Sequence, residues 1–271
     1  MKSFISSGKN IGKKTGVGYK IYSGAAAVLI LFLIWNMMAR RLPAIVLPSP
    51  LETFQALYSL FLSGELIAEI LITLRRTFIG FGLAILMGLI LAVMLKSGKR
   101  WRFFFRPLIT IVQVTPPVVW LIMAVIWFGI ADDLTPIFLI FIVTFPLVFL
   151  NIFSGLEDIK EELLEMARVY RFNKKQILFS IYLPSLIPHL VSAISIGLSF
   201  AWKSSVFAEF IGSNSGIGFA LSMAHSNLNT EVFFAWAMVL IILMLVFEYL
   251  ILQPLYSSVT VWRKNEDDNE S

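Results

Sequence analysis

The residues with the clearest chemical potential are charges that stand inside long apolar stretches. Lys203 lies within such a stretch, directly after Trp202, and Glu209 follows six residues later. A charge at membrane depth is costly, so it faces a partner or a water-filled cavity. Two interpretations stay open: Lys203 attracts an anionic solute, or it forms an ion pair with Glu209 of a neighbouring protomer or of another helix.

The sequence contains no pattern typical of catalysis or of metal binding. There is no cysteine, which excludes disulfides, thiol chemistry and Cys-ligated zinc. The two histidines, His189 and His225, are too isolated to form a metal site. No nucleophile stands near a base in the sequence. We therefore expect no catalytic residue, no metal site and no cofactor bound by this chain.

The composition predicts a membrane protein. The 271 residues are 58% hydrophobic and 14% charged, whereas ordinary soluble domains are about 45–50% apolar and about 25% charged. The apolar runs are continuous rather than alternating, so the spanning segments are expected to be helices. The predicted fold class is therefore an all-α, polytopic membrane helical bundle.

Six apolar runs are long enough to cross a bilayer and predict six transmembrane helices. They lie at about 21–39, 70–95, 107–130, 135–153, 186–211 and 232–256. The third run is interrupted by Pro116-Pro117, which removes two backbone donors and should break or kink the helix. This break either lines a cavity or is a simple kink without contact to a solute.

Shorter signals predict where two further features lie. Ser49, Pro50 and Glu52 form the start signal of an interfacial helix, which ends at Ser63-Gly64. The apolar stripe of this helix is expected to contain Leu51, Phe54, Leu57, Tyr58 and Phe61. Arg75 and Arg76 stand near the end of the second span, where long side chains can snorkel to the interface.

The most polar segment of the chain, residues 157–184, is predicted to form two short helices joined by a tight turn. Asp158 with Glu161 and Asn173 with Gln176 are the two cap signals, and Pro184 is expected to end the second helix. One face of the first helix should be apolar and the other charged. The apolar set is Ile159, Leu163, Met166, Ala167 and Tyr170, and the charged set is Glu161, Glu162, Glu165 and Arg168.

The distribution of basic residues predicts the orientation. Seventeen of the 22 Lys and Arg residues lie in the N-terminal arm, the 96–106 loop, the polar segment and the tail, so the positive-inside rule places these in the cytoplasm. This rule also explains the net charge of +5 without nucleic acid. The expected division is a basic cytoplasmic arm (1–20), a first transmembrane helix (21–40), an extracytoplasmic segment with the interfacial helix (41–68), a core of five spans (69–257) and a cytoplasmic tail (258–271).

The polar segment resembles the cytoplasmic "EAA" loop of permease subunits in bacterial ATP-binding-cassette (ABC) importers. That loop reads E-A-A, three residues, G, nine residues, I-x-L-P. Here Glu165-Met166-Ala167 stand at the triplet, and Ile181-Tyr182-Leu183-Pro184 close the pattern at the right distance. Met166 replaces an alanine, and Arg171 replaces the glycine, which serves a turn conformation that is costly for other residues. A right-handed backbone conformation at Arg171 would mean that the helix pair differs from that of its relatives. A left-handed conformation would mean that the turn is preserved at some strain.

The resemblance covers about residues 45–262 and is closest to the branch for nitrate, sulfonate, taurine and bicarbonate. It rests on Leu47-Pro48-Ser49-Pro50, Thr115-Pro116-Pro117-Val118-Val119-Trp120, Trp127-Phe128-Gly129-Ile130, Ala208-Glu209 and the Gly212–Gly218 turn. Relatives in this branch also carry thiamine precursors and other heterocycles. The resemblance implies an importer-permease fold in the bacterial cytoplasmic (inner) membrane, with both termini cytoplasmic.

The resemblance also implies the partners and the roles of residues. The partners are a second permease subunit as a homodimer, two cytoplasmic ABC ATPases that bind ATP and Mg²⁺, an extracytoplasmic substrate-binding protein and the lipid bilayer. Glu161, Glu162, Glu165, Met166, Ala167, Arg168, Tyr170 and Arg171 are implied to couple to the ATPase, and the solute pathway is expected to include Lys203, Trp202, Glu209, Pro116 and Pro117. A secondary transporter that works alone is the rival hypothesis, since Glu209 and Glu248 are acids within spans.

Overall fold

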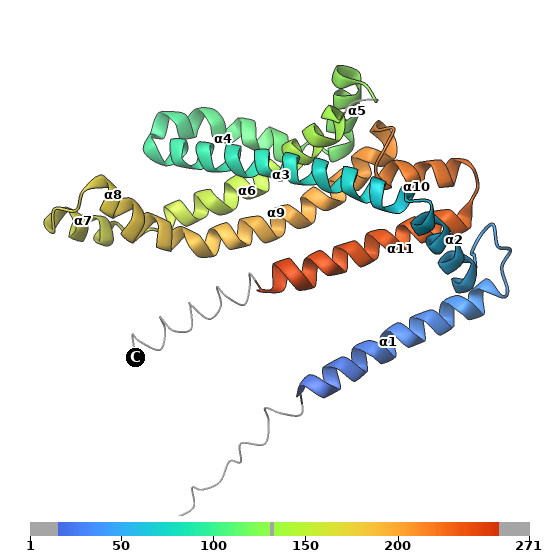
Figure 1. The fold of residues 1–271 in the computed structure, drawn as a ribbon. Coiled ribbons are helices and arrows are strands. Elements are labelled where there is room, and N and C mark those ends of the chain that lie inside the picture. Colours follow the sequence, from blue (N-terminus) through green and yellow to red (C-terminus); the bar gives the residue numbers. More distant parts are fainter. Residues whose placement is uncertain (1–15, 131–132, 255–271) are drawn as a thin grey trace, which may run out of the picture.

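The computed structural model describes residues 16–130 and 133–254, in which every regular element is a helix (Figure 1). In chain order these are α1 (Gly16–Ala39), α2 (Pro50–Leu62), α3 (Glu65–Ser97), α4 (Lys99–Val114), α5 (Pro117–Phe128), α6 (Leu134–Glu157), α7 (Glu161–Val169), α8 (Lys174–Ile177), a π-helical turn (Leu178–Tyr182), α9 (Leu183–Gly212), α10 (Ile217–Ser226), α11 (Thr230–Phe247) and a second π-helical turn (Glu248–Leu252). The prediction of an all-α chain is confirmed. The predictions for residues 1–15 and for the tail 258–271 concern residues outside the described part of the chain.

Four helices are long and apolar enough to cross a membrane, and a fifth span results if α4 and α5 count as one. The four are Glu65–Ser97, Leu134–Glu157, the continuous helix Lys174–Gly212, and Thr230–Leu250. The described apolar part of α1, Ala26–Ala39, is shorter than these. The described residues therefore support four to five of the six predicted spans, and the sixth is not confirmed.

The core is a layered arrangement in which α6 lies between α3 and α9 (Figure 1). Val148 of α6 shows why these helices approach closely. A Cβ atom added to Gly88 of α3 would lie 2.9 Å from Val148 Cγ1, and one added to Gly197 of α9 would lie 3.0 Å from Val148 Cγ2. Small residues let helices pack closely in membranes, where dispersion rather than water exclusion drives association.

The break predicted at Pro116-Pro117 is present. Pro116 precedes α5, Pro117 is its first residue, and α4 and α5 are bent by 96° relative to each other. A proline tolerates the first helical position because no donor is required there. Both prolines are exposed in this protomer, so the structure separates the two short helices without burying the break.

Helix α2 begins as predicted, and it packs through residues outside the expected apolar stripe. Ser49 and Glu52 form the reciprocal capping box, with the Ser49 N–H donating to Glu52 Oε2 at 2.7 Å. The buried residues are Pro50, Thr53, Ala56 and Leu60. Leu51, Phe54, Tyr58 and Phe61 of the expected stripe are exposed, and Leu57 is partly buried. These apolar side chains form the stripe expected from the sequence, and the interfacial position of the helix stays a prediction.

Two predicted helix boundaries in the polar segment are wrong. Asp158 is the residue after α6 rather than the cap of α7, and Lys160 precedes α7 without a side-chain cap. Pro184 does not end the second helix, because the chain continues through the π-helical turn into α9. The Leu183 N–H bonds to Leu178 O across this turn. Such a wider turn changes the hydrogen-bond register, which lets a helix continue past a proline that lacks a donor.

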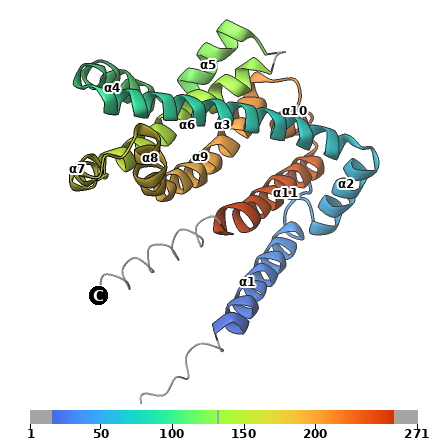
Figure 2. The same cartoon turned by 60° about the vertical axis from the view of Figure 1, so that its left-hand side comes forward.

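Helix α1 lies apart from the α3–α6–α9 layers, on the far side of α11 (Figures 1 and 2). Its attachment is aromatic: Trp35 donates its indole N–H to Pro48 O at 3.0 Å and stacks on Phe234 of α11 at a centroid distance of 6.2 Å. Trp35, near the C-terminal end of α1, therefore joins this helix to the segment before α2 and to α11.

Candidate functional site

The polar segment and the α10 region lie at opposite ends of the helical bundle (Figure 1). The first contains α7, α8 and the π-helical turn that leads into α9. The second contains the Gly212–Gly218 turn and α10. Helix α9 connects the two, and the polar side chains with the clearest roles gather at its two ends.

Arg171 adopts the left-handed conformation that the motif glycine would adopt, with φ of 53°. The Phe172 N–H donates to Ala167 O at 2.8 Å and the Arg171 N–H donates to Arg168 O at 3.0 Å, which is the hydrogen-bond pattern of a Schellman C-cap. A left-handed residue with a Cβ costs roughly 1–2 kcal/mol. The turn therefore survives the loss of glycine at some strain.

Helix α7 rests on the core through one side and leaves an apolar side uncovered in the protomer. Ala167 is 0% exposed, and Ile159, which precedes the helix, is also buried. Leu163, Met166 and Tyr170 are exposed, with Tyr170 at 71%. The single apolar face expected from the sequence is thus divided, because the helix begins at Glu161 and Ile159 no longer belongs to it.

The charged residues of α7 point away from the core. Glu161, Glu162, Glu165 and Arg168 are exposed, and none of them forms an ion pair within the described part of the chain. They lie beside the exposed apolar residues of the same helix. This combination of an apolar strip with charged flanks is typical of a helix that binds in a groove of a partner.

The base of the polar segment is fixed to the membrane helices by side-chain contacts. Arg102 of α4 pairs with Glu157 and lies over the Phe153 ring, 4.9 Å from its centroid. His189 of α9 approaches Asp158, with Nε2 3.4 Å from Oδ2. Both contacts join the start of the polar segment to a neighbouring helix, so α7 stands on a supported base.

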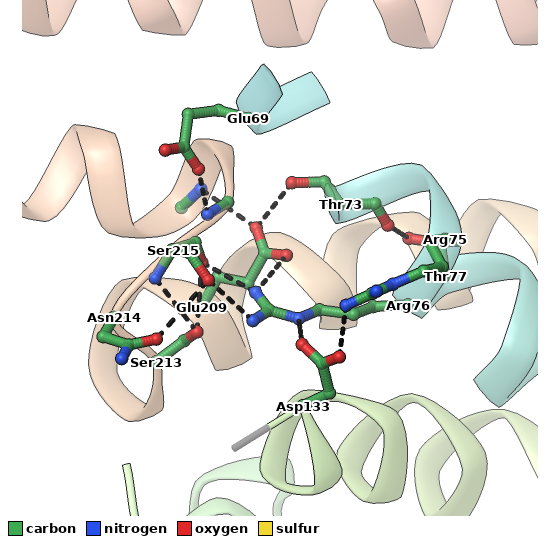
Figure 3. Close-up of polar contacts among 12 residues, drawn as sticks. Glu69, Thr73, Arg75, Arg76, Thr77, Asp133, Glu209, Ser213, Asn214 and Ser215 are labelled. Carbon is green, nitrogen blue, oxygen red and sulfur yellow. Dashed lines mark hydrogen bonds and ion pairs between the residues drawn. The ribbon is translucent and has the colours of Figure 1, made fainter. Parts of the chain in front are cut away.

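At the other end of α9, Glu209 is fully buried and receives several hydrogen bonds (Figure 3). Thr73 Oγ1 and the Gly218 N–H donate to Oε2 at 2.8 and 3.1 Å, and Arg76 Nη1 donates to Oε1 at 3.1 Å. One carboxylate thus joins α3, α9 and α10. Buried charges are tolerated when they are paired and hydrogen-bonded in this way.

Arg76 extends these contacts to two further segments (Figure 3). Its Nε donates to Asp133 Oδ1 at 2.7 Å, Nη1 to Ser215 O at 2.7 Å and Nη2 to Ser215 Oγ at 2.8 Å. We call Thr73, Arg76, Asp133, Glu209 and Ser215 the Arg76–Glu209 cluster. Arg76 was expected to snorkel to the interface, but this is wrong: its exposed fraction is 1% because the cluster encloses it.

Glycines give the turn its fit over Glu209. Gly216 has φ of 97°, and a Cβ atom there would lie 2.3 Å from the Glu209 carboxyl carbon. A Cβ atom at Gly218 would lie 2.3 Å from Val206 O. The turn is therefore pressed against α9 with no space for side chains at either position.

Lys203 is not part of this cluster. It is exposed and lies beside an apolar groove between α9 and α11, with Nζ 5.9 Å from the centroid of the Phe200 ring. Glu209 pairs with Arg76, so an ion pair between Lys203 and Glu209 does not occur within the protomer. Trp202 is buried against Phe247, at a centroid distance of 5.3 Å.

Sequence reasoning singled out Glu209 but missed its partners. Thr73, Arg76, Asp133 and Ser215 were not selected as site residues, and Arg76 was placed at the interface. The sequence did contain one signal for this pair, because Arg76 and Glu209 are opposite charges within two apolar spans. Their separation of 133 residues hid the pairing.

Comparisons with known proteins agree with the fold. Residues 84–257 match the family described as "Binding-protein-dependent transport system inner membrane component". A solved structure of the MetNI methionine ABC transporter in an inward-facing conformation is similar with a TM-score of 0.61 and 18% identity, over 70% of this chain and 94% of that chain. At this identity the likeness supports the fold alone.

Three curated relatives match most of the chain. "Putative aliphatic sulfonates transport permease protein SsuC" of Bacillus subtilis (strain 168) is 29% identical, over 80% of this chain and 79% of its own. Nitrate import permease protein NrtB of Synechocystis sp. (strain ATCC 27184 / PCC 6803 / Kazusa) is 26% identical over 80% and 82%, and taurine transport system permease protein TauC of Escherichia coli (strain K12) is 26% identical over 88% of each. The chain therefore belongs to the family of binding-protein-dependent transport system inner membrane components, as a non-catalytic ABC permease subunit.

Proposed function

We propose that this importer permease carries a small organic or inorganic anion by alternating access, and that α7 binds the ATPase subunit. The observation that carries the proposal is the division of α7 into two sides. Ala167 fixes the helix to the core, whereas Met166 and Tyr170 form an apolar strip that the described residues 16–130 and 133–254 leave uncovered. A partner groove would cover this strip, and the exposed charges of α7 would pair at its rim.

The basic residues support an orientation in which the polar segment faces the cytoplasm, together with both termini. ATP and Mg²⁺ would then bind to two partner ATPases. An extracytoplasmic binding protein would deliver the solute at the opposite end. A second copy of this chain is the proposed partner within the membrane.

Lys203 supports an anionic solute. Its ammonium group stands within α9 beside apolar side chains, and no acid pairs with it in the described part of the chain. The names of the relatives refer to aliphatic sulfonates, nitrate and taurine, and each of these carries an anionic group. Trp202 and the Pro116-Pro117 break are proposed to shape the pathway rather than to hold the solute. A neutral or cationic heterocycle is the alternative.

The docking proposal is tested with two equally exposed residues. Tyr170 at the end of α7 is 71% exposed, and Leu228 at the end of α10 is 69% exposed. Met166→Asp combined with Tyr170→Asp should reduce co-purification of the ATPase at least tenfold, because charges would enter the apolar contact. Leu228→Asp should leave it unchanged. Full association of the ATPase with the double variant would overturn the role of α7.

The substrate proposal is tested at Lys203. Lys203→Met should lower uptake of a sulfonate or nitrate at least tenfold while the complex still assembles, and Lys203→Arg should retain most of the uptake. Equal uptake by the Met variant would remove Lys203 from the pathway. Retained uptake of a heterocycle by that variant, without any anion transport by the native complex, would favour the alternative.

A further inference from the structure

We propose that Arg76 is a positioning residue for transport: through Glu209 it fastens the far end of α9 to α3 and to the Gly212–Gly218 turn. Motion of the polar segment would then reach the opposite end of the bundle through α9. The inference rests on the proposed docking of α7 and goes beyond it, because it assigns the transmitting element and the residue that completes it.

The transmitting element is one continuous helix. Residues Lys174–Gly212 form a helical segment of 39 residues, which is about 58 Å long at 1.5 Å per residue. The hydrocarbon core of a bilayer is about 30 Å thick. The segment is therefore long enough to start in the polar segment, cross the membrane and end beyond it, with Glu209 close to its final residue.

The far end of this helix is joined to other elements by charged hydrogen bonds rather than by apolar contacts alone. The Glu209 carboxylate accepts hydrogen bonds from the Thr73 and Arg76 side chains of α3 and from the Gly218 N–H of α10. Thr73 also accepts the Ile217 N–H at 2.9 Å. Any shift of this end of α9 must therefore carry α3 and α10 with it, or separate charges that have no water to replace their partners.

The turn cannot slide over the end of α9 either. A Cβ atom added to Gly216 would lie 2.3 Å from the Glu209 carboxyl carbon, and one added to Gly218 would lie 2.3 Å from Val206 O. Arg76 holds the same turn through both the carbonyl and the hydroxyl of Ser215, and it holds the segment before α6 through Asp133. The cluster therefore behaves as one rigid body at the end of α9, and not as a latch that opens in each cycle.

The adjacent arginine provides a matched control. Arg75 and Arg76 are neighbours on α3 and both bind Asp133 (Figure 3). The Arg75 side chain is 57% exposed and has no contact with Glu209, whereas the Arg76 side chain is 2% exposed. Removal of either charge changes the same helix and the same acid, but of the two arginines only Arg76 bonds to Glu209 of α9.

The experiment uses the complete transporter in proteoliposomes, with its ATPase and its binding protein. Arg76→Gln combined with Glu209→Gln removes both charges, preserves the approximate side-chain size and leaves no unpaired buried charge. Arg75→Gln is the control. Because the native chain has no cysteine, Asn214→Cys gives a single fluorophore position on the exposed part of the turn. Iodide quenching of this fluorophore is compared without nucleotide and after trapping with ATP and vanadate.

In the native background, we expect nucleotide trapping to change the quenching constant at least twofold. The double Gln variant should assemble and hydrolyse ATP. Its quenching constant should no longer change on nucleotide trapping, and its uptake per ATP should fall at least tenfold. Arg75→Gln should retain both within twofold. A purely structural cluster would instead lower the amount of assembled complex without altering uptake per ATP in the part that assembles.

Three results would overturn the proposal: no nucleotide response of the turn in the native background, unchanged uptake in the double Gln variant, or an equal loss in Arg75→Gln. If the double variant does not assemble, Arg76→Lys is measured in the same assays. It keeps the charge but not the bonds to Asp133 and Ser215, so native uptake and response in Arg76→Lys would also overturn the proposal. Failure of the α7 docking proposal is recognised by a different result, because the ATPase would then still associate with the Met166→Asp, Tyr170→Asp variant.

Discussion

The two ends of α9 hold similar residue types in opposite states. At the α7 end, four charged side chains are exposed and without an ion pair in the described part of the chain, and the apolar residues beside them are uncovered. At the Arg76–Glu209 end, Arg76 and Glu209 are buried and bonded to side chains and backbone of four segments. One end is completed within the protomer, and the other is not.

This difference supports the proposal that the α7 end, rather than the cluster, is the surface for a partner. Exposed charges and apolar groups gain little inside the protomer, so they are available for an interface. Charges that are fully paired and desolvated have nothing further to offer a partner and instead fix geometry. Under the two proposals above, the same helix would join a docking surface at one end to a fixed cluster at the other.

The largest expected effect comes from filling the space under the turn. Gly216→Ala places a Cβ atom on the Glu209 carboxylate and forces a side-chain residue into φ of 97°. We expect a loss of roughly 2–5 kcal/mol in the free energy of unfolding. The measurement is the apparent Tm of the detergent-solubilised chain by size exclusion with fluorescence detection.

Gly82→Ala is the control for this change, because it lies within α3, no atom lies within 4 Å of its added Cβ, and its φ is ordinary. Alanine favours a helix over glycine by about 1 kcal/mol, so this variant should be as stable as the native chain or more stable. Equal Tm values for both variants would mean that the turn is looser than the contacts around Gly216 indicate.

The next effect concerns one hydroxyl group. Thr73→Val removes the bond to Glu209 and leaves the Ile217 N–H unpaired, so we expect a loss of about 1–3 kcal/mol. Thr77 is equally buried one turn later, but its hydroxyl only bonds back to Thr73 O. Thr77→Val should therefore cost less than about 1 kcal/mol. Chemical unfolding of both variants measures the difference, and a larger loss for Thr77→Val would contradict this ranking.

The features that sequence reasoning predicted correctly are local. Asn173 and Gln176 are three residues apart and form the predicted capping box, with both bonds at 2.8 Å. Pro116 and Pro117 also act locally, because each lacks the backbone N–H that would continue the helix. Asp158 failed as a cap because α6 continues to Glu157 and Asp158 is its terminating residue. A local cap signal fails when the residue that carries it already belongs to the end of the preceding helix.

The Arg76–Glu209 cluster could not be predicted in the same way. Its members come from α3, the segment before α6, α9 and the turn before α10, and pairing depends on which helices are neighbours. Lys203 was the nearest basic residue to Glu209 in sequence, but six residues along one helix do not share a face. The packing of α3 beside α9 decides the pairing, and the sequence contains no short-range sign of it.

A smaller effect concerns the two left-handed residues that end α7 and α10. Arg171 has φ of 53° and Leu228 has φ of 56°, and both stand in the same Schellman hydrogen-bond pattern. Glycine at either position relieves the strain but adds freedom to the unfolded chain, so we expect a net gain of roughly 0.5–1 kcal/mol for each. Thermal unfolding should give equal shifts for Arg171→Gly and Leu228→Gly.

ATPase coupling should separate these two variants. Arg171→Gly changes the proposed contact surface of α7, so the stimulation of ATP hydrolysis by the loaded binding protein is expected to change, whereas Leu228→Gly should leave ATPase association unaltered. If Arg171→Gly lowers the stability of the protomer, the arginine side chain supports the turn beyond its backbone conformation, and the strain argument is wrong.

The smallest effect distinguishes the two capping boxes by pH. The backbone N–H and the hydroxyl of Ser49 donate to Glu52 and hold the pKa of its carboxyl below the ordinary value of 4.5. A lowered pKa in the folded state means that this box contributes stability above the ordinary pKa value and loses it as the pH falls through the lowered pKa.

The box at α8 uses Gln176, which does not titrate. Amide exchange at Ser49, corrected for its intrinsic pH dependence, should therefore lose protection as the pH falls below the ordinary value of 4.5 and through the lowered pKa, while Asn173 keeps its protection. Glu52→Gln should remove the pH dependence at Ser49, and parallel losses at both caps would indicate general unfolding rather than titration of Glu52.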